Sequence, residues 1–528
     1  MIDIEQKYTI DGPFSILDFW KLPSATLYRT IHNLRQDSFA SNHRIVFTCF
    51  DNLDQSKIKE FLVKLQQCVT FVDIGNCFIL IASNQTWIEQ YLVEVKQQWA
   101  MPTEDHVIEH KFYDVPSTEI DLSDVVAILN PPATVCAQPW ISLDINSTGE
   151  FKPCCFFKET ILDDNGTAFH VTTHSLKQVY NSNYLKDLRA QFVKGERPAP
   201  CVRCWNEERD GAHSKRMLLK HRFLPYSFDA NWEQNDIENL KFVSFAAGNI
   251  CNLKCRICNP ESSSKIAEEQ LKLIPSKEKK SHTVYQNLVK GRWIDNQDLT
   301  IWDQMFDSDI NIEYFDISGG EPMLQVRHFW ALQKIIDQGR SEQVQLRYNT
   351  NGTIFPDDYT DLWKKFKLVS LDVSIDNIQD RIEYERSGVE WDLLQLNLSK
   401  FFNLQSDKIK INLHLAISIQ NVLYLPEMCD WIVQQPFSSV HFSYLYVPDM
   451  LNIGKVTPAA RTLILQRLRA YTCTDSRLQS FITNTIDILK SAETSNGKEF
   501  CHYMKHLDKI RNQDFSKTHN EIAVAMGY

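Results

Sequence analysis

The chain has 528 residues, which is long enough for two or more domains that each bury a core of their own. Its composition, 43% hydrophobic and 23% charged, excludes a mainly disordered or collagen-like protein. The formal net charge of −11 repels polyanions, so nucleic acid is not an expected partner. No stretch approaches the roughly 20 apolar residues of a membrane helix, and the first residues contain no secretory signal, so we expect a cytoplasmic protein without a membrane partner.

Residues 1–130 are expected to form a small α/β domain. Apolar, β-branched runs at 44–50 and 77–84 have the length and composition of strands. Each is followed by apolar residues at the i, i+3, i+4, i+7 spacing of a helix, at 58–65 and at 88–95. No catalytic motif falls in this domain, and its role stays open.

Six strand-like runs alternate with helical stretches in the barrel region expected at 236–450. The runs are KFVSFAA, IEYFDIS, QLRYNT, LVSLDVSID, INLHLAISI and VHFSYLYV. Because parallel neighbours require a crossover connection, this alternation predicts βαβ units and a parallel sheet. Reactive groups are then expected at the carboxyl ends of the strands. The remaining residues, 451–528, are expected to be helical.

A group of three cysteines directly follows the first of these strands. Cys251, Cys255 and Cys258 lie in CNLKCRIC with the spacing C-x3-C-x2-C. Three thiolates can bind three irons of a 4Fe-4S cluster and leave the fourth iron open to a non-protein ligand. A zinc knuckle or a chance cluster is compatible with the spacing alone. The second strand runs into GGEP at 319–322, where two glycines allow a close backbone approach to a ligand.

CNLKCRIC together with GGEP on neighbouring strand ends resembles the radical S-adenosylmethionine superfamily. The resemblance implies a partial (β/α)6 barrel whose 4Fe-4S cluster, held by the three cysteines, binds and reductively cleaves S-adenosylmethionine. A reducing partner such as flavodoxin or ferredoxin would supply the electron. The further cofactor-binding residues that the resemblance implies are Ile257, Ser318, Gly319, Gly320, Glu321, Asn351, Ser374, Asp376 and Arg386. For Arg386 the alternative is an ordinary surface arginine, and for Asn351 a turn residue.

A second metal site is expected in residues 131–225. CAQPWISLDINSTGEFKPCC at 136–155 has the pattern of two short strands around a turn, and CVRC at 201–204 has the paired spacing that binds one metal or one cluster edge. Four thiolates suit structural zinc about as well as an iron–sulfur cluster. The expected ligands are Cys136, Cys154, Cys201 and Cys204, with Cys155 as the alternative to Cys154.

The order of these features resembles the twitch half of the SPASM auxiliary-cluster domain. It implies an auxiliary 4Fe-4S cluster in a domain that precedes the barrel, whereas in most relatives this domain follows it. The resemblance implies a ribosomally made peptide or protein as substrate. A small molecule, such as a sugar, an alcohol or a nucleotide-derived compound, is the alternative. A metal-stabilised binding protein without turnover is the third hypothesis.

Overall fold

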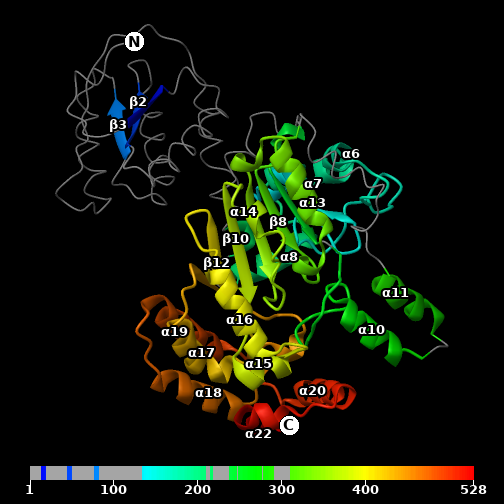
Figure 1. Cartoon of the computed structure of the whole chain (residues 1–528), viewed down its shortest axis with the longest axis vertical. Coiled ribbons are helices and arrows are strands. Elements are labelled where there is room, and N and C mark those ends of the chain that lie inside the picture. Colours follow the sequence, from blue (N-terminus) through cyan, green and yellow to red (C-terminus); the bar gives the residue numbers. More distant parts are fainter. Residues whose placement is uncertain are drawn as a thin grey trace. The chain divides into compact units, whose positions relative to one another are not determined.

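The structure is a computed structural model of the chain, and it describes residues 134–209, 214–217, 237–246, 248–275, 278–290 and 310–528 together with three N-terminal strands (Figure 1). These strands are β1 (Phe14–Asp18), β2 (Arg44–Cys49) and β3 (Cys77–Ile81), and they form a parallel sheet in the order β1-β2-β3. Both strands predicted in the N-terminal domain are therefore confirmed. The two helices predicted there lie outside the described residues.

The chain divides into two compact units. The first comprises residues 1–141, 156–159 and 181–239, and the second comprises 142–155, 160–180 and 240–528. In the first unit, α7 (Asn183–Val193) begins at Ser182, whose hydroxyl accepts the backbone N–H of Leu185. The buried face of α7 includes Phe192, whose ring lies 6.3 Å from that of Trp140.

An eight-stranded sheet forms the core of the second unit. Its order is β13-β12-β10-β9-β8-β6-β4-β5, and all neighbouring pairs are parallel except the β4–β5 hairpin. Six of these strands are the six predicted runs, in chain order, so the predicted α/β class with a parallel sheet is confirmed. The strands are β4 (Ser142–Ile145), β5 (Phe151–Lys152), β6 (Phe242–Ala246), β8 (Tyr314–Ser318), β9 (Gln345–Thr350), β10 (Leu368–Ser374), β12 (Ile409–Ile417) and β13 (Ser439–Tyr444).

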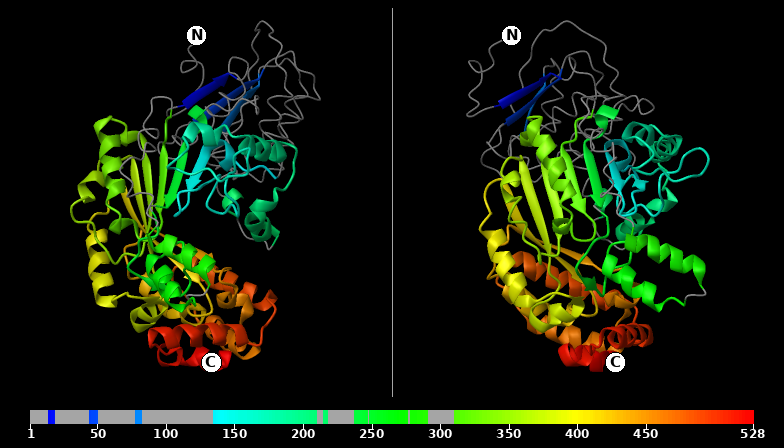
Figure 2. Two further views of the ribbon diagram at one scale, coloured as in Figure 1. Left: turned by 90° about the vertical axis from the view of Figure 1, so that its right-hand side faces the viewer. Right: turned by 45° about the vertical axis from the view of Figure 1, so that its right-hand side comes forward.

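Alternation of apolar and polar residues gives this sheet two different faces. In β10, Val369, Leu371 and Val373 are fully buried and alternate with polar residues. The apolar face packs against the crossover helices, which Figure 2 shows along one side of the sheet. The ring of Tyr348 in β9, for example, lies 5.6 Å from that of Trp363. The helices that follow the strands β6 to β12 in the chain are α10 (Ser264–Leu273), α11 (Lys279–Lys290), α13 (Arg327–Asp337), α14 (Thr360–Trp363), α15 (Gln379–Glu385), α16 (Trp391–Phe402) and α17 (Leu425–Ile432), of which α10 and α11 lie away from the sheet in Figure 1.

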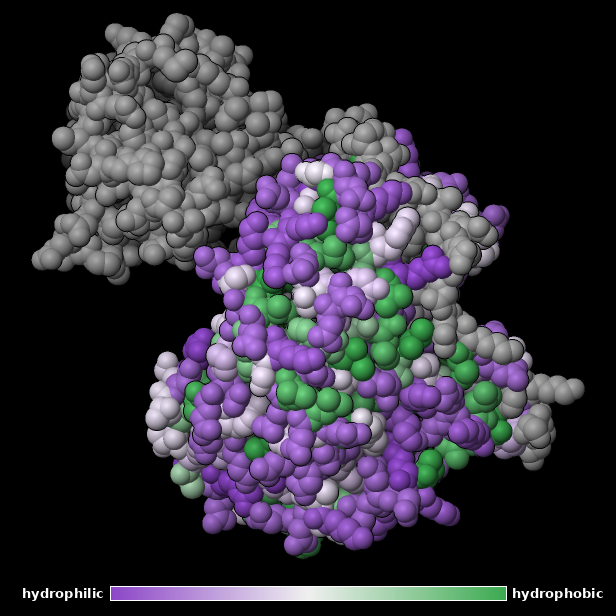
Figure 3. All heavy atoms as spheres, viewed as in Figure 1, coloured by the Kyte–Doolittle hydropathy of each residue, from purple (hydrophilic) through white to green (hydrophobic). Residues whose placement is uncertain are grey.

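The end of the chain is helical, as predicted, and its helices lie on the side toward which the strand arrows of Figure 1 point. In the view of Figure 3 their surface is mostly hydrophilic. None of the described helices is long and apolar enough to cross a lipid bilayer. The C-terminal helices are α18 (Pro458–Ala470), α19 (Ser476–Ser491), α20 (Lys498–Arg511), α21 (Phe515–Thr518) and α22 (Asn520–Met526).

Candidate active site

The loop that carries the three cysteines is anchored on both sides. It follows β6, and its middle forms the short strand β7 (Lys254–Cys255), which pairs antiparallel with β11 (Arg386–Ser387). In this register Cys255 lies opposite Arg386. Ser263, the N-cap of α10, donates its hydroxyl to the carbonyl oxygen of Leu253 at 2.8 Å. These contacts hold the loop at the carboxyl end of the sheet.

The thiols of this loop are close enough to affect one another electrostatically. Burial raises the pKa of Cys251 and of Cys258 to about 12, and the neighbouring Cys255 acts in the same direction. Such thiols are protonated at neutral pH, so they bind as thiolates only where a metal supplies positive charge. Within the described residues, no three His, Cys, Asp or Glu side chains are arranged to hold a metal ion.

Three hydrogen-bond donors face the sulfur atoms. The backbone N–H of Leu253 lies 3.4 Å from the Sγ of Cys251, and the Nδ2 of Asn351 lies 4.0 Å from the same atom. The Nη1 of Arg386 lies 3.9 Å from the Sγ of Cys255. Donors at these positions stabilise negative charge on sulfur, so the residues present fit an iron–sulfur cluster held by thiolates.

The GGEP turn contacts the cysteine loop through its backbone. The N–H of Gly320 donates to the carbonyl of Gly248 at 3.0 Å, and the N–H of Glu321 donates to that of Ile250 at 2.7 Å. A Cβ atom added at Gly320 would lie 2.0 Å from the carbonyl oxygen of Ile250, so this approach requires glycine. The structure therefore brings together the two motifs that the sequence singled out.

Glu321 connects this turn to the end of β9. Its buried carboxylate accepts the hydroxyl of Thr350 and the backbone N–H of Asn351, both at 2.7 Å, and the backbone N–H of Met323 at 3.1 Å. Burial raises the pKa of Glu321 to about 7, although the three hydrogen bonds act against this shift. Asn351 in turn donates to the side chain of Asn252 in the cysteine loop at 3.0 Å.

Arg386 is buried, which excludes the alternative of a surface arginine. Its Nε and Nη2 donate to one carboxylate oxygen of Asp376 at 2.8 and 2.7 Å. The other oxygen of Asp376 accepts the backbone N–H of Ala416 in β12 at 2.9 Å. Asp376 thus orients the guanidinium group beside Cys255 and raises the pKa of Arg386, against the effect of burial.

The other expected cofactor contacts lie along the same edge of the sheet. Ser318 ends β8, Ser374 ends β10 opposite His414, and Ile257 lies within the cysteine loop. All of these residues except His414 were predicted, and each is half-buried. Gly319, with φ of +127°, begins the GGEP turn in a backbone conformation that favours glycine. Their contact with a cofactor stays a prediction.

One residue of this site was missed by the sequence reasoning. Arg256 lies between the second and third cysteines, and its side chain is completely buried. It forms an ion pair with Asp508, which lies 252 residues further along the chain. A basic residue in a loop normally indicates a solvated position, so the sequence contained no signal for this pair.

The first unit brings three of the four expected auxiliary ligands together. Burial raises the pKa of Cys136 to about 12, and the charges of Cys201 and Cys204 act in the same direction. Arg216 donates to the carbonyl of Val135 at 2.8 Å and so holds the chain next to the first of these cysteines.

The fourth auxiliary ligand is not decided by the structure. Cys154 and Cys155 follow β5 in the second unit, the former half-buried and the latter exposed. The choice between them therefore stays open.

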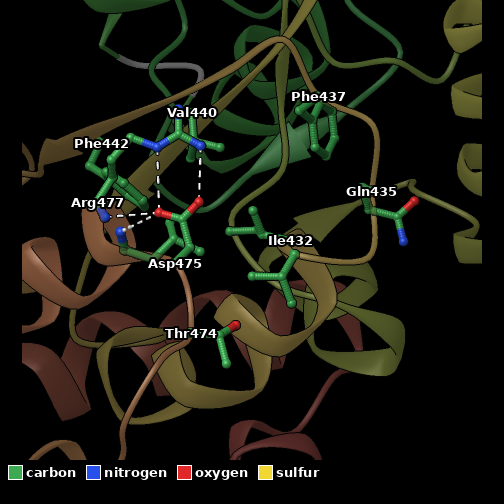
Figure 4. A pocket seen from close by; sticks show the side chains of 10 residues that line it. Ile432, Gln435, Phe437, Val440, Phe442, Thr474, Asp475 and Arg477 are labelled. Atoms are coloured by element: carbon green, nitrogen blue, oxygen red, sulfur yellow. Dashed lines mark hydrogen bonds and ion pairs between the residues drawn. The ribbon is translucent and has the colours of Figure 1, made fainter.

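A cavity of about 400 Å³ lies elsewhere in the second unit, between α17, β13 and the start of α19 (Figure 4). Its Asp475 carboxylate binds Arg477 at 2.9 Å and caps α19. None of the predicted site residues lines this cavity.

Comparison with known proteins bears on both metal sites. Residues 136–205 match the SPASM family of iron–sulfur cluster-binding domains. This match favours an iron–sulfur cluster over zinc at the auxiliary site. The matched residues precede the loop with the C-x3-C-x2-C triad in the chain, and they include the strands β4 and β5 of the eight-stranded sheet. The match agrees with the resemblance of this chain to the radical S-adenosylmethionine superfamily. The cofactors of this superfamily are 4Fe-4S clusters and S-adenosylmethionine.

The individual proteins that this chain resembles are distant from it in sequence. GTP 3',8-cyclase of Haemophilus influenzae (strain Rd KW20) is 23% identical over 203 residues, 38% of this chain and 52% of the relative. The chain therefore matches about half the length of this relative. Native anSMEcpe with bound AdoMet has a TM-score of 0.29 and 16% identity, over 48% of this chain and 63% of that one. SuiB of Streptococcus suis bound to S-adenosylmethionine has a TM-score of 0.27 and 14% identity, over 48% and 46%. Structural likeness at these TM-scores says nothing about the substrate.

Proposed function

We propose that this chain is an enzyme that reductively cleaves S-adenosylmethionine and removes a hydrogen atom from a substrate carbon. When bound and reduced, the cluster supplies the electron that breaks the sulfonium carbon–sulfur bond, giving methionine and a 5'-deoxyadenosyl radical that takes the hydrogen atom. The observation that carries the proposal is the direct backbone contact between the cysteine loop and the GGEP turn at the carboxyl end of the sheet.

Each group in this site has a proposed role. Cys251, Cys255 and Cys258 hold the barrel cluster, and Arg386 donates to one of its thiolates. The half-buried Ser318 and Gly319 receive the amino group of the methionine moiety. Ile257 lies against the adenine, and Ser374 contacts the ribose or carboxylate. Flavodoxin or ferredoxin delivers the electron.

The polar side chains on the face of the sheet opposite the apolar one support a polar substrate. Arg347 in β9 binds Asp316 at 3.2 Å and Asp372 at 2.5 Å, and its side chain remains partly exposed. Asn412 in β12 donates to the same Asp372 at 2.9 Å, and Ser439 in β13 donates to Asn412 at 2.8 Å. This row of polar and charged side chains across five neighbouring strands suits a substrate with many hydrogen-bonding groups.

The proposed substrate is a ribosomally made peptide or protein. Support comes from the SPASM-type domain, because the resemblance associates this domain with peptide modification. The auxiliary cluster, held by Cys136, Cys201, Cys204 and either Cys154 or Cys155, would accept the electron that leaves the modified substrate. A nucleotide-derived small molecule is the second candidate, and the sequence match to GTP 3',8-cyclase favours it.

Deuterium transfer distinguishes the two substrates. The reconstituted enzyme is incubated with dithionite, S-adenosylmethionine and either a deuterated peptide encoded next to the gene or deuterated GTP. We expect deuterium in 5'-deoxyadenosine with the peptide only, because hydrogen abstraction moves the label. Label from GTP alone would establish the second candidate. Unlabelled 5'-deoxyadenosine with both would contradict the proposed peptide substrate.

A further inference from the structure

The end of the chain forms part of the surroundings of the cysteine loop. The helices α20–α22, here called the C-terminal segment (residues 498–528), contact this loop through side chains of α20. Arg256, in the loop between Cys255 and Cys258, is the centre of these contacts. Its guanidinium group stacks on the ring of Tyr384 at 3.8 Å and donates to Asp508 at 2.5 Å and to Gln513 at 3.0 Å.

Asp508 is the residue on which this network converges. Besides Arg256, one carboxylate oxygen accepts the hydroxyl of Tyr384 at 2.6 Å. The other oxygen accepts the backbone N–H of Phe515 at 2.7 Å and the hydroxyl of Tyr528. The carboxylate is 5% exposed, so its negative charge is matched by a buried cation and by neutral donors.

The C-terminal segment also binds the backbone of the cysteine loop directly. The hydroxyl of Tyr503 donates to the carbonyl oxygen of Arg256 at 2.6 Å. The Nη1 of Arg511 donates to the carbonyl oxygen of Lys254 at 2.8 Å. The residues on both sides of Cys255 are therefore held from α20, because these two carbonyls flank that cysteine.

A further contact links the hydrogen bonds around Arg256 to Arg386, whose guanidinium group faces the thiol of Cys255. The backbone N–H of Arg256 donates to the carbonyl of Glu385 at 2.9 Å, and Glu385 directly precedes Arg386. A shift of Arg256 would therefore move both the cysteine loop and β11. This coupling distinguishes the network from a simple attachment of the end of the chain.

We propose that Asp508 is a positioning residue for the barrel cluster: through Arg256 it fixes the cysteine loop so that the three thiolates meet the cluster in one geometry. The inference rests on the proposed function, because it assigns the role of the loop to cluster binding. The test uses the whole chain with both clusters reconstituted.

The test compares Asp508→Ala with Glu521→Gln, a control in the same segment. Glu521 is half exposed and pairs with Arg467 at the surface, so its loss should leave the cysteine loop unchanged. Two readouts do not depend on turnover: the electron paramagnetic resonance spectrum of the reduced barrel cluster, and hydrogen–deuterium exchange of residues 251–258. The third readout is the rate of 5'-deoxyadenosine formation.

For Asp508→Ala we expect a changed spectrum and faster exchange in the loop. We also expect about 10- to 100-fold slower cleavage, the range found when partners that orient metal ligands are removed. The control should match the wild type. If Asp508→Ala does not fold, Tyr503→Phe, which removes one hydroxyl, should show the same changes to a smaller degree.

Wild-type spectra, exchange and rates in a folded Asp508→Ala variant would overturn the proposal. So would wild-type values for Tyr503→Phe where the first variant fails to fold. Failure of the wild-type protein itself to cleave S-adenosylmethionine would instead refute the proposed function, so the two outcomes are distinguishable.

Discussion

At the scale of single residues, the contact between the two motifs depends on the missing side chain of Gly320. We predict that Gly320→Ala destabilises the protein by about 3 kcal/mol, because its Cβ must displace the backbone at Ile250. The iron content after reconstitution should fall from about eight to about four, as expected when one 4Fe-4S cluster is lost. Thermal unfolding and iron analysis measure both effects.

Gly454→Ala is the matched control for this variant. A Cβ there would lie 3.3 Å from the side-chain oxygen of Asn452 and 3.6 Å from Ala492, contacts that small side-chain shifts accommodate. Its stability and iron content should stay close to those of the wild type. Equal behaviour of the two variants would mean that the approach of the turn to the loop is not essential.

The sequence predicted the residues of the site whose signal is local. The cysteine triad and GGEP are short motifs, and their meeting follows from the rule that parallel strands end at one edge. Arg256 and Asp508 were not predictable, because their pairing joins positions 252 residues apart. The burial of Arg386 likewise depends on Asp376 and on the packing of neighbouring strands, which composition does not reveal.

At the scale of elements, α10 is tied to α20 by a buried carboxylate. Glu269 binds Arg511 at 2.8 Å and Lys254 at 3.0 Å, and its side chain is 7% exposed. These two cations lower the pKa of Glu269 although burial opposes them. We predict that Glu269→Gln lowers stability at pH 7 by about 3 kcal/mol, because it leaves buried charges unpaired.

The pH dependence of this effect follows from the lowered pKa. The pKa of Glu269 is near 4.5 in the unfolded chain and lower in the folded protein, so its contribution to stability is complete above pH 4.5. That contribution begins to be lost at pH 4.5 and is gone once the pH has fallen through the lowered pKa of the folded protein. The difference in the free energy of unfolding between the variant and the wild type should therefore shrink below pH 4.5 in denaturation experiments.

The control is Glu268→Gln, which breaks an exposed ion pair with Lys265 and should change stability by less than about 0.5 kcal/mol at any pH. A loss of stability for Glu269→Gln that is the same above and below pH 4.5 would contradict a stabilising role for the charge of Glu269.

The positions of the strands were predicted from the sequence, whereas the pairing between strands was predicted only in part. Six runs became parallel strands because β-branching and alternation are local properties of the sequence. The hairpin β4–β5 was predicted as part of the auxiliary region, yet β4 also pairs with β6, with Leu143 opposite Val243. Such pairing depends on tertiary contacts between segments about a hundred residues apart, which local patterns do not encode.

At the scale of the whole molecule, we propose that one chain holds two clusters with different tasks. In our proposal only the barrel triad of Cys251, Cys255 and Cys258 leaves an iron open for S-adenosylmethionine, whereas a fourth cysteine completes the auxiliary cluster. Variants of the two sites should therefore fail differently. Replacement of Cys201 and Cys204 should preserve cleavage that is uncoupled from substrate modification.

Formation of 5'-deoxyadenosine under anaerobic, reducing conditions tests this claim most directly. We predict that the wild type and the Cys201/Cys204→Ala variant form 5'-deoxyadenosine from S-adenosylmethionine with dithionite. The Cys251/Cys255/Cys258→Ala variant should form none, although each variant, checked as monodisperse, should retain about four irons. Product from the barrel variant, or its absence from the iron-loaded wild type, would contradict the account.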